Sequence, residues 1–214
     1  MRDLDRARAA MVRSQLVGRD ITDPRVLAAF EAVPRHRFVL PGDERAAYTD
    51  SPLPIGEGQT ISQPYMVAFM VQSLKLQPSD RVLEVGTGSG YAATICAHLA
   101  AAVLTVERLP GLAAAARRLL AELDVANVTV VEGDGSVGWP QQAPYDAILV
   151  SAGAPNIPKA LVDQLAPGGR LVVPVGDRWS QQLLRVRRTP QGDVTDHLGG
   201  VRFVPLLGAQ GWPA

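Results

Sequence analysis

Between residues 80 and 175 the chain alternates short apolar runs with segments of helical periodicity, and this alternation constrains the fold more than any other feature. We predict strands in RVLEV, AVLTVE, NVTVVEGD, YDAILV and RLVVPV. We predict helices in GYAATICAHLA, PGLAAAARRLLAEL and IPKALVDQLA. The strands are rich in Val, Leu and Ile along their whole length, as expected when both faces of a sheet are covered. The pattern predicts an α/β fold with a doubly wound sheet.

The segments on either side of this core carry weaker signals. Asp23 followed by Pro24 is typical of a helix start, and this helix should end before Pro34. Residues 48–66 have the composition of a loop, and Pro64 should open a second helix, PYMVAFMVQSLKL. Residues 181–206 predict two further strands around a turn at 191–192.

The chain has 214 residues, which is enough for one full-sized domain. We therefore expect a single domain over 1–214. It would comprise N-terminal helices and a ligand loop (1–75), the core (76–190) and a C-terminal strand and tail (191–214).

Charge and cysteine content exclude several classes of protein. The 21 basic and 21 acidic side chains cancel, which argues against a nucleic-acid or membrane-surface binder. The single Cys96 excludes an internal disulfide and should be a buried core residue. The three histidines are too far apart to form a metal-binding motif, so we expect no metal. No signal-peptide core and no run of about 18 apolar residues is present, so we expect a cytoplasmic protein.

The loop after the first predicted core strand, GTGSGY at 86–91, resembles part of a dinucleotide site. Gly86 and Gly88 match the G-x-G-x-x-G fingerprint, but the third glycine, Gly90, comes one position early. Since ligands of doubly wound sheets bind beyond the carboxyl ends of the strands, the residues at these ends matter most.

Three carboxylates, Glu84, Glu107 and Asp134, lie at the ends of successive predicted strands. They suit a ligand with positive charge, a ribose diol and an adenine amine better than they suit a pyrophosphate. S-adenosylmethionine has all three groups and no phosphate. Each acid alone is an ordinary strand-end or turn residue. The ordered set of acids after the glycine loop favours a methyltransferase.

The chain resembles the protein-L-isoaspartate O-methyltransferase family from about residue 10 to 206. The segment PLPIGEGQTISQPYMVA ahead of the core and the segment VRFVPL near the C-terminus carry the specific part of the resemblance. VLEVGTGSGY, VERLPGLAAAARRLL, EGDGSVGWPQQAPYDAILV and LAPGGRLVVPVG follow in the family's order. The resemblance implies a Rossmann-like S-adenosylmethionine-dependent methyltransferase fold with an N-terminal helical and loop extension and C-terminal strands.

The reaction implied by the resemblance is methyl transfer from S-adenosylmethionine to the α-carboxyl of L-isoaspartyl residues in damaged proteins and peptides, which begins their repair. The family motifs imply a catalytic Ser62 and cofactor contacts from the following residues: Gln59, Thr60, Ile61, Ser62, Glu84, Gly86, Thr87, Gly88, Gly90, Glu107, Arg108, Asp134 and Gly135. They imply that the substrate peptide lies along Ser62, Val201, Arg202, Phe203 and Val204. The expected partners are isoaspartyl-containing proteins, with no nucleic acid, membrane or metal.

The chemistry agrees with these residue types. A carboxylate is ionised at neutral pH and needs no strong base, so the site must align it with the methyl group. Ser62 lies just before the helix that Pro64 opens, where helix N–H groups and the helix dipole favour an anion. Without the resemblance, Ser62 is equally a plain helix-start residue.

Two alternatives stay open at this point. One is a dedicated methyltransferase that esterifies an ordinary aspartate in a natural-product precursor peptide. The other is a protein that binds S-adenosylmethionine without catalysis. A nucleic-acid methyltransferase is disfavoured because SAGAP lacks the N/D-P-P-Y/F pattern. Gly153 and Asn156 stand where alanine and glutamate are more usual in the family, which leaves substrate preference open.

Overall fold

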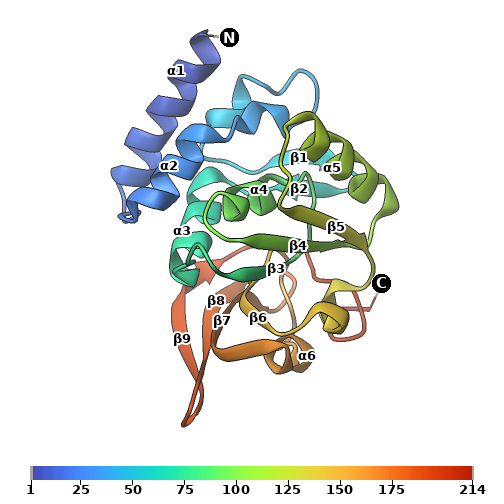
Figure 1. Cartoon of the computed structure of the whole chain (residues 1–214). Coiled ribbons are helices and arrows are strands. Elements are labelled where there is room, and N and C mark those ends of the chain that lie inside the picture. Colours follow the sequence, from blue (N-terminus) through green and yellow to red (C-terminus); the bar gives the residue numbers. More distant parts are fainter. Residues whose placement is uncertain (1, 214) are drawn as a thin grey trace.

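The computed structural model describes residues 2–213 and has a seven-stranded sheet at its centre (Figure 1). The strand order is β5-β4-β3-β6-β7-β8-β9, and the first five of these strands are parallel. The bounds are β3 Arg81–Val85, β4 Ala102–Glu107, β5 Val128–Glu132, β6 Tyr145–Val150, β7 Leu165–Gly176, β8 Gln181–Thr189 and β9 Gly192–Val201. The chain builds outward from β3 to β5 on one side and from β6 to β9 on the other, so the order reverses between β3 and β6.

Helices cover both faces of the sheet, as the alternation predicts (Figure 1). Their bounds are α1 Arg2–Met11, α2 Pro24–Ala32, α3 Pro64–Leu74, α4 Tyr91–Ala97, α5 Pro110–Glu122 and α6 Lys159–Asp163. Along each strand, successive side chains enter opposite layers. Val82 packs with the N-terminal helices and Leu83 packs with α6. The doubly wound fold is therefore confirmed.

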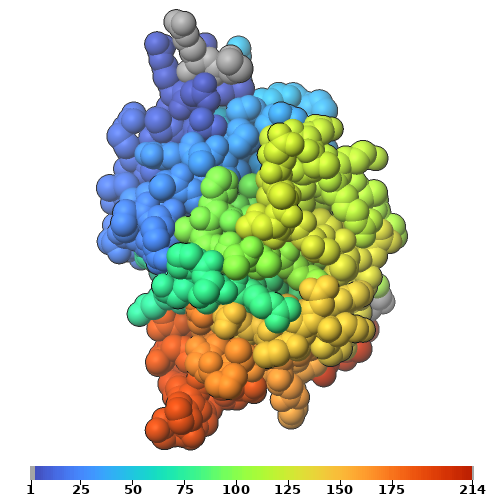
Figure 2. Space-filling model, in the orientation of Figure 1, coloured from blue at the N-terminus to red at the C-terminus, as the bar shows by residue number. Residues whose placement is uncertain are grey.

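The N-terminal extension packs on the sheet through the same apolar cluster as α3 and α4. Phe30 of α2 is fully buried and meets the ring of Tyr91 of α4 edge-on, at a centroid distance of 5.9 Å. The predicted start of α2 is confirmed, since the Asp23 carboxylate accepts a hydrogen bond from the Arg25 N–H at 2.9 Å. Figure 2 shows this N-terminal part (blue) and the β8–β9 hairpin (red) at opposite ends of the molecule.

Several elements differ from the sequence prediction. The segment 48–66, predicted as a loop, contains an antiparallel hairpin of β1 Leu53–Gly56 and β2 Gln59–Ile61. These strands are short, with two prolines at or next to their ends, so local composition hid them. Helix α6 has one and a half turns, because β7 already begins at Leu165. In VRFVPL only Val201 belongs to a strand.

Other expectations from composition concern single residues. Cys96 is fully buried, as predicted, and burial raises the pKa of its thiol. No helix within residues 2–213 has the length and apolarity needed to cross a membrane. In the same described range, His, Cys, Asp and Glu side chains form no group of three able to hold a metal ion.

Candidate active site

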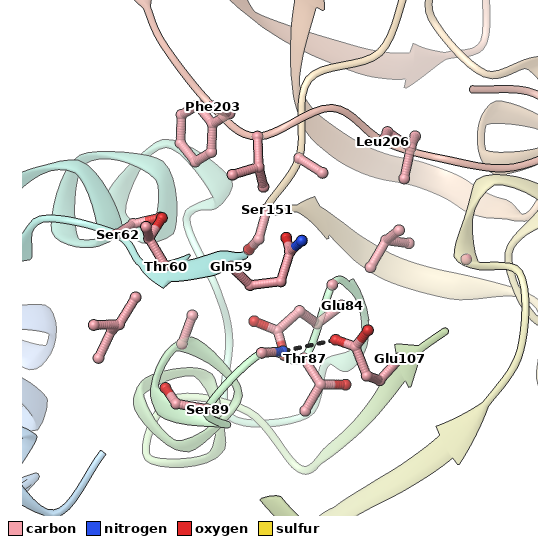
Figure 3. A pocket seen from close by; sticks show the side chains of 18 of the residues that line it. Gln59, Thr60, Ser62, Glu84, Thr87, Ser89, Glu107, Ser151, Phe203 and Leu206 are labelled. Carbon is pink, nitrogen blue, oxygen red and sulfur yellow. Dashed lines mark hydrogen bonds between the residues drawn. The ribbon is translucent and has the colours of Figure 1, made fainter. Parts of the chain in front are cut away.

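A cavity of about 280 Å³ lies at the carboxyl ends of β3, β4 and β6, where the strand order reverses (Figure 3). This is the place at which doubly wound sheets bind ligands. Three distant parts of the chain line it: the β2 segment with α3, the strand ends of the sheet, and residues 203–207. We call it the central cavity.

Glu84 is fully buried at the end of β3 and lines the central cavity. Its Oε2 accepts a hydrogen bond from the Thr105 hydroxyl at 2.6 Å, and the Thr87 hydroxyl in turn donates to Thr105 at 2.7 Å. Its Oε1 has no hydrogen-bond partner within the described residues. Burial raises the pKa of Glu84 to about 8, and the nearby Glu107 carboxylate acts in the same direction. A buried oxygen without a partner in a cavity wall is suited to a cationic ligand group.

Glu107, at the end of β4, anchors the glycine loop. Its Oε2 accepts a hydrogen bond from the Gly88 N–H at 2.9 Å, which is the dashed line in Figure 3, and its Oε1 accepts one from the Leu109 N–H at 3.0 Å. Only 6% of Glu107 is exposed. Gly88 has φ +52°, which favours glycine, and a Cβ there would come within 3.2 Å of Ile55 in β1. Each carboxylate oxygen keeps a second lone pair that can accept from a ligand hydroxyl.

Ser62 lies between β2 and α3, at the side of the view opposite Glu107 (Figure 3). Figure 3 draws no hydrogen bond from its hydroxyl to the other residues shown. Gln63, rather than Ser62, is the N-cap of α3, and the Asp50 carboxylate already accepts a hydrogen bond from the Tyr65 N–H at 3.3 Å. The helix start is therefore partly satisfied, and Ser62 is one of the polar residues that line the cavity.

Asp134 does not line the central cavity, whereas its neighbour Gly135 does. Asp134 Oδ1 accepts hydrogen bonds from the N–H and hydroxyl of Ser136, at 2.9 and 2.6 Å, and Oδ2 accepts one from the Ala209 N–H at 2.7 Å. These hydrogen bonds hold the pKa of Asp134 below its usual range, although partial burial opposes them. Its carboxylate thus fixes the C-terminal segment beside the cavity.

A second, larger groove of about 1040 Å³ adjoins the central cavity. Six residues line both: Thr60, Ser62, Ser151, Phe203, Val204 and Pro205. Val201 and Arg202 line the groove only. We call it the outer groove. Ser62 is therefore positioned where the central cavity opens into the outer groove.

The structure brings most of the sequence-predicted cofactor residues together around the central cavity: Gln59, Thr60, Ile61, Ser62, Glu84, Gly86, Thr87, Gly88, Glu107, Arg108 and Gly135. Gly90 lies outside the lining, because it starts α4 with φ +87° and its Cα faces Ala116 and Leu120 of α5. Gly90 therefore serves close packing of helices next to the loop.

Sequence reasoning missed several residues of the cavity wall. Ser151 and Ala152 follow β6, and the sequence signal that could have identified them is their place in SAGAP, directly after a predicted strand. Leu206 and Leu207 reach the cavity because the C-terminal segment bridges back to the sheet between Pro205 and Gly153. A contact of this kind joins segments that are distant in the sequence, so no local sequence pattern indicates it.

A family model described as protein-L-isoaspartate(D-aspartate) O-methyltransferase (PCMT) matches residues 6–211. A protein-L-isoaspartate O-methyltransferase of Trichlorobacter lovleyi is 55% identical over 213 residues, which cover 99% of this chain and 98% of that protein. A protein of the same name from Methanoculleus marisnigri is 55% identical over 207 residues, or 97% of this chain and 94% of the relative.

Solved structures give the same result. One named protein-L-isoaspartate O-methyltransferase superposes with a TM-score of 0.86 at 29% identity, covering 95% of this chain and 67% of that chain. A beta-aspartate methyltransferase (PCMT) of Plasmodium falciparum in complex with S-adenosyl-L-homocysteine superposes with a TM-score of 0.81 at 27% identity, over 94% and 98% of the two chains. With the family model matching nearly the whole sequence, this chain belongs to the protein-L-isoaspartate O-methyltransferase family.

Proposed function

We propose that the protein transfers a methyl group from S-adenosylmethionine to the α-carboxylate of L-isoaspartyl residues in proteins and peptides. The observation that carries this proposal is the position of Ser62 at the junction of the central cavity and the outer groove. A methyl donor in the cavity and a peptide in the groove would meet at this junction. The names of the relatives agree with this reaction.

The central cavity fits the proposed cofactor. Glu84 Oε1 is a buried acceptor without a partner, which suits the cofactor's ammonium or sulfonium. Glu107, at the other strand end, has lone pairs for the ribose diol. When bound, S-adenosylmethionine supplies an activated methyl group. The proposed cofactor contacts also include Gln59, Thr60 and Arg108.

The chain's own groups have a limited chemical task. The substrate carboxylate is already ionised near neutral pH, so no residue has to remove a proton from it. What the site must supply is orientation. The Ser62 hydroxyl can donate a hydrogen bond to one carboxylate oxygen, and Phe203 and Val204 can hold the adjoining peptide. The role of Asp134 toward adenine, implied by the family motif, would use a lone pair left over from its contacts with Ser136 and Ala209.

The test compares two synthetic peptides that differ only in carrying L-isoaspartyl or L-aspartyl at one position, with radiolabelled methyl donor. We expect methyl incorporation into the isoaspartyl peptide and far less into the aspartyl peptide. Equal methylation of both, or methylation of the aspartyl peptide alone, would contradict the proposed specificity and favour an aspartate methyltransferase. Cofactor binding without methylation of either peptide would indicate a binding protein.

A further inference from the structure

The outer groove carries a charge pattern that the reaction itself does not explain. Arg19, Arg178 and Arg202 line it, and no Asp or Glu belongs to its lining. Arg19 is neutralised, since it pairs with Asp50 at 2.9 Å and stacks on the ring of Tyr65. Neither Arg178 nor Arg202 forms an ion pair with a residue in the described range 2–213. Two positive charges of the groove lining therefore have no ion-pair partner in this range, although the whole chain has a net charge of zero.

Aromatic rings hold both of these arginines at the rim. The guanidinium of Arg202 lies 5.8 Å from the centre of the Trp179 ring, and that of Arg178 lies 5.2 Å from the centre of the Trp212 ring. Such contacts place a guanidinium without neutralising it. Trp179 is 75% exposed, an unusual state for the largest apolar side chain. The one acid of this turn, Asp177, uses its carboxylate internally, to accept hydrogen bonds from the N–H groups of Trp179 and Ser180.

The two sides of the groove have different chemistry. Thr60, Ser62 and Gln63 come from the β2–α3 junction, where the reacting carboxylate would be oriented. Arg178 and Trp179 come from the turn between β7 and β8, and Arg202 follows β9. The groove, at about 1040 Å³ against about 280 Å³ for the central cavity, has room for residues beside the one that reacts.

Resting on the proposed function, we propose that Arg178 and Arg202 form a specificity subsite that selects substrates with acidic side chains near the isoaspartyl residue. The partner is a protein or peptide segment in which Asp or Glu flanks the damaged position. The carboxylates of these flanking residues would pair with the two guanidinium groups at the rim, while the reacting carboxylate lies at Ser62. Charge pairing at a rim of this kind is sensitive to salt.

The experiment measures the binding of three labelled peptides by fluorescence anisotropy. Each carries the same isoaspartyl residue, with Glu, Ala or Lys at the neighbouring positions, and flanks on the two sides are varied separately. We expect the Glu peptide to bind about two- to fivefold more tightly than the Ala peptide, as for exposed ion pairs, and the Lys peptide to bind more weakly. The differences should shrink at high salt.

Three variants complete the test. The double variant R178A/R202A should bind the three peptides with similar affinity, and R178E/R202E should prefer the Lys peptide. Arg187→Ala is the matched control, because Arg187 is an exposed arginine on β8 that pairs with Asp196 outside the groove. It should keep the wild-type order. Cofactor affinity checks that each variant is folded.

Two outcomes would overturn the subsite. Wild type could bind all three peptides equally, or R178A/R202A could weaken all three by the same factor, which would assign the arginines to the reacting carboxylate. Because the readout is binding, the result is independent of turnover. Failure of the proposed function would be recognised by a different result. In that case, wild type would not methylate the Ala-flanked isoaspartyl peptide, or would methylate its aspartyl counterpart equally.

Discussion

Glu84 and Glu107 end neighbouring strands, yet their surroundings differ. Glu84 accepts a hydrogen bond from one hydroxyl, and its other oxygen has no hydrogen-bond partner within the described residues. Glu107 accepts hydrogen bonds from two backbone N–H groups. Burial with few donors disfavours the charged form of a carboxylate, and this is the situation of Glu84. Two acids that look equivalent in the sequence therefore have different hydrogen-bond partners, and each supports a separate prediction.

Glu107→Ala should weaken binding of S-adenosylmethionine about tenfold or more. Hydrogen bonds to a charged group contribute about 1.5–3 kcal/mol, and about 1.4 kcal/mol corresponds to a factor of ten. Calorimetric titration measures the dissociation constant. Glu132→Ala is the control, because Glu132 is the register partner of Glu107 on β5 but lies outside the cavity. An unchanged constant in folded Glu107→Ala would make Glu107 a loop anchor alone.

Glu84 should make stability depend on pH. Its folded-state pKa is about 8 against an ordinary value of 4.5, so the folded protein keeps a proton that the unfolded chain has lost. The stabilising contribution of this proton is complete below the unfolded pKa and is lost as pH rises through about 8. We expect the free energy of unfolding of wild type, relative to Glu84→Gln, to fall as the pH rises from 4.5 to about 8. Urea unfolding at several pH values measures it, and parallel pH profiles would contradict the assignment.

Ser62→Ala should slow methylation of an isoaspartyl peptide while cofactor binding largely survives. Removing a positioned donor costs about 2.7–4 kcal/mol in oxyanion sites. The loss here should be smaller, because the nucleophile loses charge during the reaction and the donor also stabilises the ground state. Single-turnover methylation at saturating cofactor is the measurement. Ser73→Ala, which removes a hydroxyl bonded to the Phe69 carbonyl in α3, is the control. A rate equal to wild type would return Ser62 to a helix-start role.

At the scale of elements, the C-terminal segment after β9 completes the site. It bridges to the sheet at Gly153, and the Trp212 indole N–H donates to the Gly153 carbonyl at 3.1 Å. Gly208 has φ +149° and approaches Asp134 and Ser136 so closely that a Cβ would overlap both side chains. The segment therefore depends on a glycine at this position.

Gly208→Ala should detach this segment from Asp134 and open the central cavity on the side of Leu206 and Leu207. Faster hydrogen exchange in residues 206–212 and weaker cofactor binding are the expected results. Gly192→Ala is the control, since Gly192 also has positive φ, +117°, but has open space around it. It tests whether strain alone has the same effect. Unchanged exchange in Gly208→Ala would show that the segment tolerates a Cβ by shifting.

At the scale of the whole molecule, one apolar cluster joins the extension to the sheet. It runs from Met11 through Phe30 and Val71 to Leu183. We therefore predict a single cooperative unfolding transition. S-adenosylmethionine at about 100 times its dissociation constant should stabilise the fold by about 2.7 kcal/mol, and NAD at the same concentration should not. Calorimetry measures both. Two separate transitions would show that the extension unfolds independently.

The sequence by itself determined that a doubly wound sheet forms and in which order its strands and helices follow along the chain. Buried parallel strands are continuous apolar runs, so β3, β4 and β6 could be located to the residue. The strand-end acids and the glycine loop follow from the same pattern, because the carboxyl ends of parallel strands share one edge. These are local signals, and they predicted Glu84, Gly86, Gly88 and Glu107 of the cavity wall; the other predicted lining residues followed from the family resemblance.

Only the tertiary structure decided how distant segments share the site. It showed that the 48–66 segment forms a hairpin and that Asp134 holds the C-terminal segment. It also placed Arg178 and Arg202, on separate loops, along one groove. These features depend on contacts between residues far apart in the chain. The physical reason is that such contacts are stabilised by packing and hydrogen bonds which exist only once the sheet has formed, so no local pattern encodes them.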